Sequence, residues 1–357
     1  MMKKILSHLS LATMLVCCVT TAYSAGPKPE IKHFDNDSLL KVCYNKPCKP
    51  PKGYKKLVKE LSDEFNGNEL DLTKWRSGGN GGWKGRGARF MADNITVKGG
   101  CLQLKSSLIG TEEQLKELYQ FVERVFVDDS TKHLGDKIDV HTWDPAYYGD
   151  SWQAKWKDPR YNEIQEMGLD ILGAASVISL EMGTKGYYEA RIRVSNICLS
   201  SAFWMQGRTT EYDITESIGS YNVTKESMLK NLEGHRRRVG TSVWINEKEL
   251  KGKGGVPAQH HFTEEPLNEM YIVLGLKWED ELLTVYFNDK EIYNFPLRGR
   301  VTAKDNIPIP VETFKAPQHV IFDTEVLLGP TMGWPTLAEL LDPNRNIFYI
   351  DWVRVWK

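Results

Sequence analysis

The chain has 357 residues, with 46 Lys and Arg against 47 Asp and Glu, which gives a formal net charge of −1. Hydrophobic residues make up 41% and charged residues 26%, ordinary proportions for a globular protein that exclude a disordered, collagen-like or coiled-coil chain. A net charge so close to zero gives no electrostatic basis for nucleic acid as a partner. The length allows one large β domain with insertions or two smaller domains.

The N-terminal segment has the pattern of a secretory signal. Two lysines precede an apolar run over residues 5–19, and small residues follow up to Ala25. We therefore expect a signal peptide over 1–25, too short for a comfortable membrane span, and an extracellular or periplasmic protein without a membrane span. The alternative is an outer-surface lipoprotein acylated at Cys17 or Cys18, although neither cysteine follows the Gly, Ala or Ser that such a signal normally has.

Residues 26–53 are rich in Pro and Lys and show no hydrophobic periodicity, so we expect a linker before one domain over 54–357. That domain contains many short strand-like runs bounded by turn residues, and a hairpin turn is predicted at Asn288-Asp289. Many strands and few helices favour a β-sandwich or barrel. The predicted strands cover 95–97, 102–104, 177–182, 187–194, 270–278, 283–287, 319–326 and 348–356.

One helical segment interrupts this β pattern. Apolar residues have helical spacing from Leu115 to Phe126, and Thr111 with Gln114 forms a capping box before them. The helix opens a segment at about 108–172 that we interpret as an insertion between two strands. A second capping box, over 336–339, predicts a short helix before the last strand.

Four cysteines remain after removal of the predicted signal. Cys43 and Cys48 flank a short turn-forming spacer, so a local disulfide is expected in an exported chain. Cys101 and Cys198 lie in strand-like segments and could either pair or stay as buried thiols. No Cys/His cluster has the spacing of a zinc site.

The residues that indicate chemistry are three acids within 210–217. In a strand, Glu211 and Asp213 share a face because they are two residues apart. Glu216 would point to the other face, unless a β-bulge around residues 214–215 brings it back beside them. Three carboxyls on one face cost repulsion and desolvation, which a purely structural strand has little reason to tolerate.

Two close carboxyls on a strand are what a retaining glycosidase needs. One attacks the anomeric carbon and the other protonates the leaving oxygen, at a separation of roughly 5–5.5 Å. A third acid between them raises the proton affinity of its neighbour, so that the proton donor stays protonated near neutral pH. The alternative is an exposed edge strand whose acids are solvated.

The sequence Glu211-x-Asp213-x-x-Glu216 resembles the signature of glycoside hydrolase family 16, the jelly-roll endoglycanases. Segments 61–75, 186–191, 200–204 and 348–356 resemble other strands of the family in the same order. The resemblance implies an all-β sandwich of two antiparallel sheets with a concave substrate cleft. It also implies that Glu211 is the nucleophile, Glu216 the acid/base and Asp213 the assisting carboxylate.

Within the family, segment 209–219 resembles the β-agarases, and segments 83–86, 321–326 and 334–340 resemble the agarase and porphyranase branch. This implies a secreted endo-acting enzyme that cleaves β-1,4 bonds in a red-algal galactan of agar type. Alternatives on the same fold are a β-porphyranase, a carrageenan or furcellaran hydrolase and a β-1,3-glucanase. A lectin-like binding module is the alternative from another class, but it would have no use for three crowded acids. The insertion, and the lack of a His in segment 228–233, depart from the family pattern.

Several side chains are candidates for substrate binding. Trp204 and Trp83, with Trp334 behind them, are suited to stack on sugar rings, although each could equally belong to the core. The run His-Arg-Arg-Arg at 235–238 is either a solvated loop or, through His235 and Arg236, a site for a galactan sulfate. Arg86 is a candidate for the same role.

The chemistry requires no cofactor. Many members of the family carry a structural calcium, and the matching positions are Asp351 and Gly100, where an ordinary strand aspartate is the alternative. The predicted partner is the polysaccharide itself, and we expect a monomer.

Overall fold

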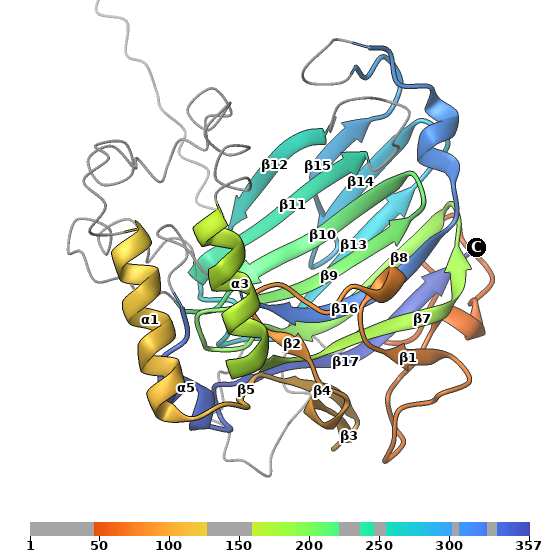
Figure 1. The fold of residues 1–357 in the computed structure, drawn as a ribbon. Coiled ribbons are helices and arrows are strands. Elements are labelled where there is room, and N and C mark those ends of the chain that lie inside the picture. The colour runs from red at the N-terminus through yellow and green to blue at the C-terminus, as the bar shows by residue number, and fades with distance from the viewer. Residues whose placement is uncertain (1–45, 127–158, 221–235, 246–254, 302–306, 327–333) are drawn as a thin grey trace, which may run out of the picture.

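Two seven-stranded sheets dominate the computed structural model (Figure 1). It describes residues 46–126, 159–220, 236–245, 255–301, 307–326 and 334–357. In order across the first sheet the strands are β1 (Trp75–Ser77), β7 (Ser176–Gly183), β16 (Gln318–Glu325), β9 (Ser200–Gly207), β10 (Thr210–Ile218), β11 (Arg238–Ile245) and β12 (Gly255–Phe262). The second has β15 (Lys290–Pro296), β14 (Leu282–Phe287), β13 (Ile272–Trp278), β8 (Gly186–Arg193), β17 (Ile347–Trp356), β4 (Cys101–Lys105) and β3 (Ile95–Lys98). All pairings within these sheets are antiparallel, as expected for a sandwich of this kind.

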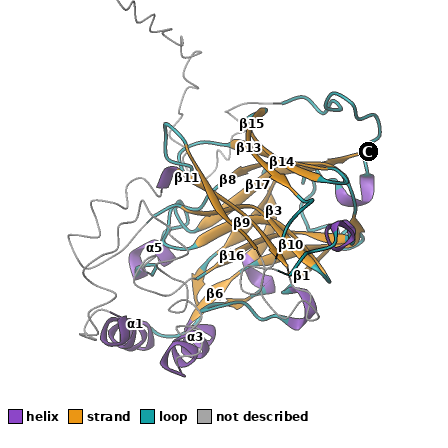
Figure 2. Ribbon diagram, turned by 90° about the horizontal axis from the view of Figure 1, so that it is seen from above, coloured by secondary structure: helices purple, strands orange, loops and turns teal. Residues whose placement is uncertain are grey.

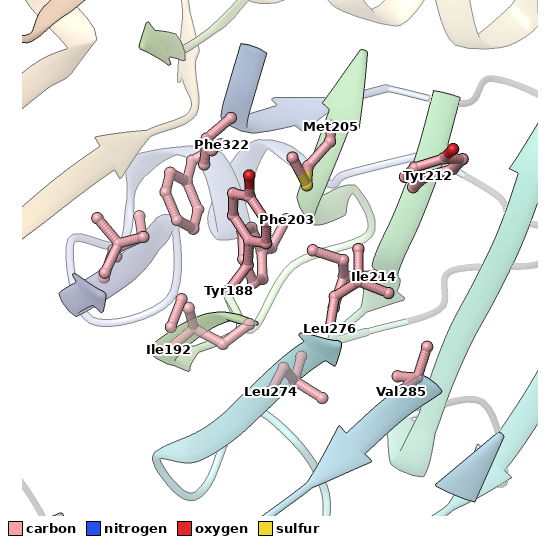
Figure 3. Packing of buried hydrophobic residues seen from close by; sticks show 14 of the residues in the cluster. Tyr188, Ile192, Phe203, Met205, Tyr212, Ile214, Leu274, Leu276, Val285 and Phe322 are labelled. Atoms are coloured by element: carbon pink, nitrogen blue, oxygen red, sulfur yellow. The ribbon is translucent and has the colours of Figure 1, made fainter. Parts of the chain in front are cut away.

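The hydrophobic core lies between the two sheets (Figure 3). From the first sheet, Phe203 and Phe322 stack with ring centroids 4.8 Å apart. From β10, Tyr212 and Ile214 point into the same core, so the alternate residues of that strand face away from it. The face of the first sheet that carries these alternate residues is called the outer face below.

The predicted insertion forms a smaller layer at one end of the sandwich (Figure 2). It contains α1 (Glu112–Phe126) and α3 (Pro159–Ile171), which pack with α5 (Leu337–Leu341) around a separate apolar cluster. A three-stranded sheet joins it to the sandwich and consists of β2 (Arg89–Phe90), β6 (Leu172–Ala174) and β5 (Ser107–Leu108). Leu108 and Leu172, where the insertion leaves and returns, are paired directly across β5 and β6.

Local predictions agree with the structure in most places. The turn at Asn288 and Asp289 has φ values of 47° and 65°, as a tight hairpin turn requires. The hydroxyl of Thr111 accepts from the Gln114 backbone N–H, the Gln114 side-chain oxygen accepts from the Thr111 backbone N–H, and both capping boxes are formed. Short 3₁₀ turns lie at Lys59–Leu61, Asn80–Gly82, Ala92–Asn94 and Val311–Lys315.

The polar side of β8 is buried rather than solvated. Glu189 and Arg191 alternate with core residues, as the sequence pattern predicts, but both side chains are fully enclosed. Lys46 binds Glu189 with a nitrogen–oxygen distance of 2.6 Å, and Arg191 forms a buried ion pair with Asp351. The chain therefore contacts the domain before Tyr54, within the segment predicted to be a linker.

Cys101 and Cys198 are buried thiols that form no disulfide in the described part of the chain. Cys43, and with it the predicted Cys43–Cys48 bridge, lies outside the described residues, as does the predicted signal 1–25. Among the helices that are described, none has the length and apolar character needed to cross a membrane.

Candidate active site

A β-bulge in β10 places the three predicted acids on one face. The register against β11 shifts between Asp213 and Glu216, and the register against β9 shifts between Asp213 and Thr215. Asp213 lies opposite Trp204 and Glu216 lies opposite Ala202, two residues that share the outer face of β9. The predicted bulge is therefore present, and Glu211, Asp213 and Glu216 line the outer face of β10. Strand β10 itself lies near the middle of the sheet (Figure 1).

Asp213 is the buried member of the row. Its carboxylate accepts hydrogen bonds from the Ser242 hydroxyl and, at 2.8 Å, from the Trp244 indole Nε1. Burial raises the pKa of Asp213 well above its usual range, the carboxylates of Glu211 and Glu216 raise it further, and the two hydrogen bonds oppose the shift. Neither Ser242 nor Trp244 was predicted as a site residue. Their only sequence signal is their alternation on the strand that pairs with β10.

Glu211 is held by a chain of polar side chains from neighbouring segments. The Gln206 amide nitrogen donates to Glu211 Oε2 at 2.7 Å, while Asn80 donates to the Gln206 amide oxygen at 3.0 Å. Arg76 in turn donates to the Asn80 side-chain oxygen at 3.2 Å. Because the Asn80 contact fixes which end of the Gln206 amide faces Glu211, this chain orients a donor towards the predicted nucleophile.

The charges of two guanidinium groups act on Glu216. Burial raises the pKa of the Glu216 carboxyl, and the positive charges of Arg238 and Arg86 oppose that shift. A carboxyl with a raised pKa keeps its proton closer to neutral pH, which is what a general acid requires. The charge of Arg86, which the sequence suggests as a ligand for a galactan sulfate, therefore acts on Glu216.

Two further acids on β16, Asp323 and Glu325, were not predicted as site residues. Burial raises the pKa of Glu325 to about 8, with Arg86 opposing the shift and Glu216 and Glu211 adding to it. Asp323 has no exposed surface, and its raised pKa comes from burial first and then from the charge of Glu325. The Trp204 indole opposes that shift.

The three predicted tryptophans fall into two groups. Trp83 is partly exposed and its ring meets that of the buried Trp204 edge-on, with centroids 6.2 Å apart, on the outer face beside the acids. Trp334 instead packs against Tyr119 at a centroid distance of 5.6 Å, in the apolar cluster of the insertion. The structure thus gives Trp334 a packing role and leaves Trp83 with Trp204 at the site.

The residues of the basic segment 235–238 also differ in whether they act on the site. His235 lies outside the described residues, as does segment 228–233. Arg236 donates to the Gly219 carbonyl oxygen at 3.2 Å and lies 3.5 Å from a Glu269 carboxylate oxygen, so its guanidinium is engaged by protein groups. Arg238, two residues further on, is the member of this run whose charge acts on Glu216.

The two residues predicted to hold calcium lie on the second sheet. The Asp351 carboxylate is paired with the buried Arg191 guanidinium, and Gly100 forms the β3–β4 turn with a φ of 76°. An arginine already supplies the positive charge that a calcium ion would bring, so the residues present do not fit a cation site. Within the described residues, no group of three or more His, Cys, Asp or Glu side chains could hold a metal.

Comparison with known proteins identifies the family. Residues 151–357, more than half of the chain, match the family described as Beta-porphyranase A-D, GH16 domain. The chain belongs to glycoside hydrolase family 16. It is therefore a glycoside hydrolase rather than a non-catalytic binding module, and hydrolysis in this family retains the anomeric configuration.

Individual members of family 16 agree with this placement. β-Porphyranase E of Zobellia galactanivorans is 28% identical over 318 residues, which cover 85% of this chain and 88% of that protein. β-Agarase AgaA of Microbulbifer thermotolerans is 28% identical over 190 residues, or 48% of this chain and 40% of that protein. The crystal structure of porphyranase B from Zobellia galactanivorans superposes with a TM-score of 0.58 at 18% identity, covering 87% of this chain and 97% of that one. This last likeness shows the jelly-roll fold.

Proposed function

We propose that this family 16 hydrolase cleaves β-1,4 bonds inside a sulfated, porphyran-type galactan of red algae. The observation that carries the proposal is the environment of Arg238. Only 5% of this residue is exposed, its charge acts on Glu216, and its Nε has no hydrogen-bond partner among the described residues. A buried guanidinium with an unused donor is costly unless a ligand satisfies it, and a sulfate ester offers two anionic oxygens that one guanidinium can bind together.

The three acids of β10 supply the proposed reaction. Glu211, held by Gln206, attacks the anomeric carbon while Glu216 gives its proton to the leaving oxygen. A glycosyl–enzyme ester forms on Glu211 and the glycosidic bond breaks. Glu216, now ionised, removes a proton from the water that hydrolyses this ester, which frees Glu211 and returns Glu216 to its protonated state. Asp213 is the assisting carboxyl: burial and the charges of Glu211 and Glu216 raise its own pKa, so it shares a proton with these neighbours.

The extent of the matches also supports the sulfated substrate. The porphyranase relative spans most of both chains, whereas the agarase match is confined to about half of this chain. The resemblance of segment 209–219 to the β-agarases favours agarose, and this proposal departs from that expectation.

Neutral agarose is the second candidate, and the Trp83–Trp204 pair favours it. An exposed indole face stacks on a sugar ring whether or not the ring carries sulfate, and agarose offers only such faces and hydroxyls. Arg238 would then serve only to balance the charge of the acids around it.

Substitution of Arg238 by Ala distinguishes the two candidates. A charge-assisted hydrogen bond contributes about 1.5–3 kcal/mol, so the change should lower kcat/KM on porphyran by roughly 10- to 100-fold relative to its effect on agarose. The ratio of kcat/KM on porphyran to kcat/KM on agarose is compared because the effect that Arg238 also has on Glu216 is common to both substrates and cancels. Initial rates of reducing-end release on porphyran, alkali-desulfated porphyran and agarose provide the measurement.

Arg236→Ala is the matched control, because this neighbouring arginine is engaged by Gly219 and Glu269. It should leave the substrate ratio unchanged. A wild-type preference for agarose, together with an unchanged ratio in Arg238→Ala, would assign the enzyme to agarose.

The stereochemistry of the first product follows from the proposed roles. Two displacements at the same carbon leave the newly released reducing end in the β configuration. Proton NMR recorded during the first minutes of hydrolysis should therefore show the β anomer before mutarotation adds the α form. Initial release of the α anomer would contradict Glu211 as a nucleophile.

The size of the substrate supports export of the enzyme. A galactan polymer does not cross a bilayer, so an enzyme that cleaves it internally has to meet it outside the cytoplasm. We accordingly propose that segment 1–25 directs secretion.

A further inference from the structure

Gly168 lies in α3, far along the sequence from the acids, yet it touches the loop that carries Trp83 and Arg86. We propose that Gly168 is a positioning residue, which seats the loop 83–88 so that Arg86 faces Glu216. Through this contact the insertion would set the charge around the acid/base. The inference rests on the proposed role of Glu216, but it does not depend on which galactan is the substrate.

The contact between α3 and the loop leaves no space for a side chain. A Cβ built on Gly168 would lie 2.3 Å from the Gly87 carbonyl oxygen and 3.0 Å from the Gly87 Cα. Glycine within a helix costs about 0.5–1 kcal/mol relative to alanine, so its presence at a buried position of α3 indicates a packing requirement. Gly87 itself has a φ of 64°, so its carbonyl is held in a conformation that other residues rarely adopt.

Other contacts hold the same loop against the end of the insertion. Arg89 Nε donates to the Leu169 carbonyl oxygen at 3.0 Å, and the Arg89 guanidinium also pairs with Asp170. Strand β2 then runs parallel to β6, with Phe90 opposite Ala174. The segment that begins at Trp83 is therefore fastened to α3 and β6 immediately after Arg86.

The loop acts on the site through a ring and a charge. The Trp83 ring meets Phe90 edge-on at 5.3 Å and Trp204 edge-on at 6.2 Å, which links β2 to the outer face. The Arg86 guanidinium opposes the raised pKa of both Glu216 and Glu325. Displacement of the loop should move both the ring and the charge away from the acids.

Titratable and charged groups from several elements surround Glu216 in the sheet, and they determine how the displacement would be detected. They are Glu211 and Asp213 on β10, Asp323 and Glu325 on β16, Arg238 on β11 with His260 beside it on β12, and Arg86 on the loop. Loss of one positive charge favours the protonated form of Glu216. The pKa of its carboxyl should then rise, and the alkaline limb of the pH–rate profile should move to higher pH.

Gly168→Ala tests the proposal through the pH dependence of kcat/KM on whichever galactan the wild-type enzyme cleaves. We expect the alkaline limb to move to higher pH and kcat/KM at the optimum to fall roughly 10-fold or more, because the loop is misplaced. Arg86→Ala should move the limb in the same direction. In the double variant the limb should move no further than in Arg86→Ala alone, because Gly168 acts through Arg86.

Glu166→Ala, at an exposed position of the same helix, is the matched control and should leave the profile unchanged. Arg89→Ala removes only the partly exposed contacts of Arg89 with α3, so this variant should fold even if Gly168→Ala does not. In Arg89→Ala the alkaline limb should move in the same direction as in Gly168→Ala, but by less. An unmoved limb in Arg89→Ala and in a folded Gly168→Ala would overturn the proposal, as would additive shifts in the double variant. Full activity of Glu216→Gln would instead refute the role of Glu216.

Discussion

Replacement of Glu211 or Glu216 by Gln should lower kcat by roughly three orders of magnitude or more while leaving the fold intact. Glutamine keeps the size of the side chain, but at 211 it removes the attacking oxygen charge and at 216 it removes the transferable proton. Asp213→Asn should cost less, because Asp213 acts on its neighbours rather than on the substrate. Rates of oligosaccharide release, with circular dichroism to verify folding, measure these effects.

The leaving group separates the two roles. A substrate with a nitrophenyl leaving group needs little protonation, so Glu216→Gln should recover much of its first-step rate on that substrate while Glu211→Gln should not. Glu181→Gln, at an exposed position of β7, is the control and should behave as wild type. Near-normal turnover in Glu211→Gln would remove the basis for the whole assignment.

Phe203→Ala should destabilise the protein by about 3–5 kcal/mol. Phe203 is fully buried under the outer face, where it stacks on Phe322 and joins β9 to β16 in the core (Figure 3). Removal of its ring leaves a cavity that closely packed neighbours fill only in part. Urea unfolding monitored by tryptophan fluorescence gives the difference in the free energy of unfolding.

Leu180→Ala is the corresponding control, because that side chain is 44% exposed and its loss should cost under about 0.5 kcal/mol. An equally small loss of unfolding free energy in Phe203→Ala would mean that the sheet carrying the acids does not depend on the stacking of Phe203 on Phe322.

The sequence is sufficient to predict the parts of the molecule in which local pattern and tertiary structure coincide. The alternation of β8, the turn at Asn288 and Asp289 and the two capping boxes each follow from near neighbours in the chain. The bulge in β10 is predictable for a different reason, since Glu216 joins Glu211 and Asp213 only if one residue is added to the strand.

The remaining site residues come from strands that meet only in the folded sheet. Gln206, Trp244 and Asp323 belong to three different strands, and their local sequence does not show that they meet the acids of β10. Trp334 shows a different limit, because a tryptophan suited to stacking on a sugar is equally suited to a core, and in the fold Trp334 packs in the cluster of the insertion. Asp351 likewise has a buried arginine as its partner, which sequence spacing does not reveal.

The pairing of Leu108 with Leu172 has an evolutionary consequence. A segment that departs and returns at adjacent backbone positions can grow or shrink with little effect on the register of the sandwich, because each doubling of a loop costs only about 0.6 kcal/mol. The returning end of this segment nevertheless borders the loop with Trp83 and Arg86. Changes in its length or composition can therefore retune substrate choice in a descendant enzyme while its catalytic strand stays the same.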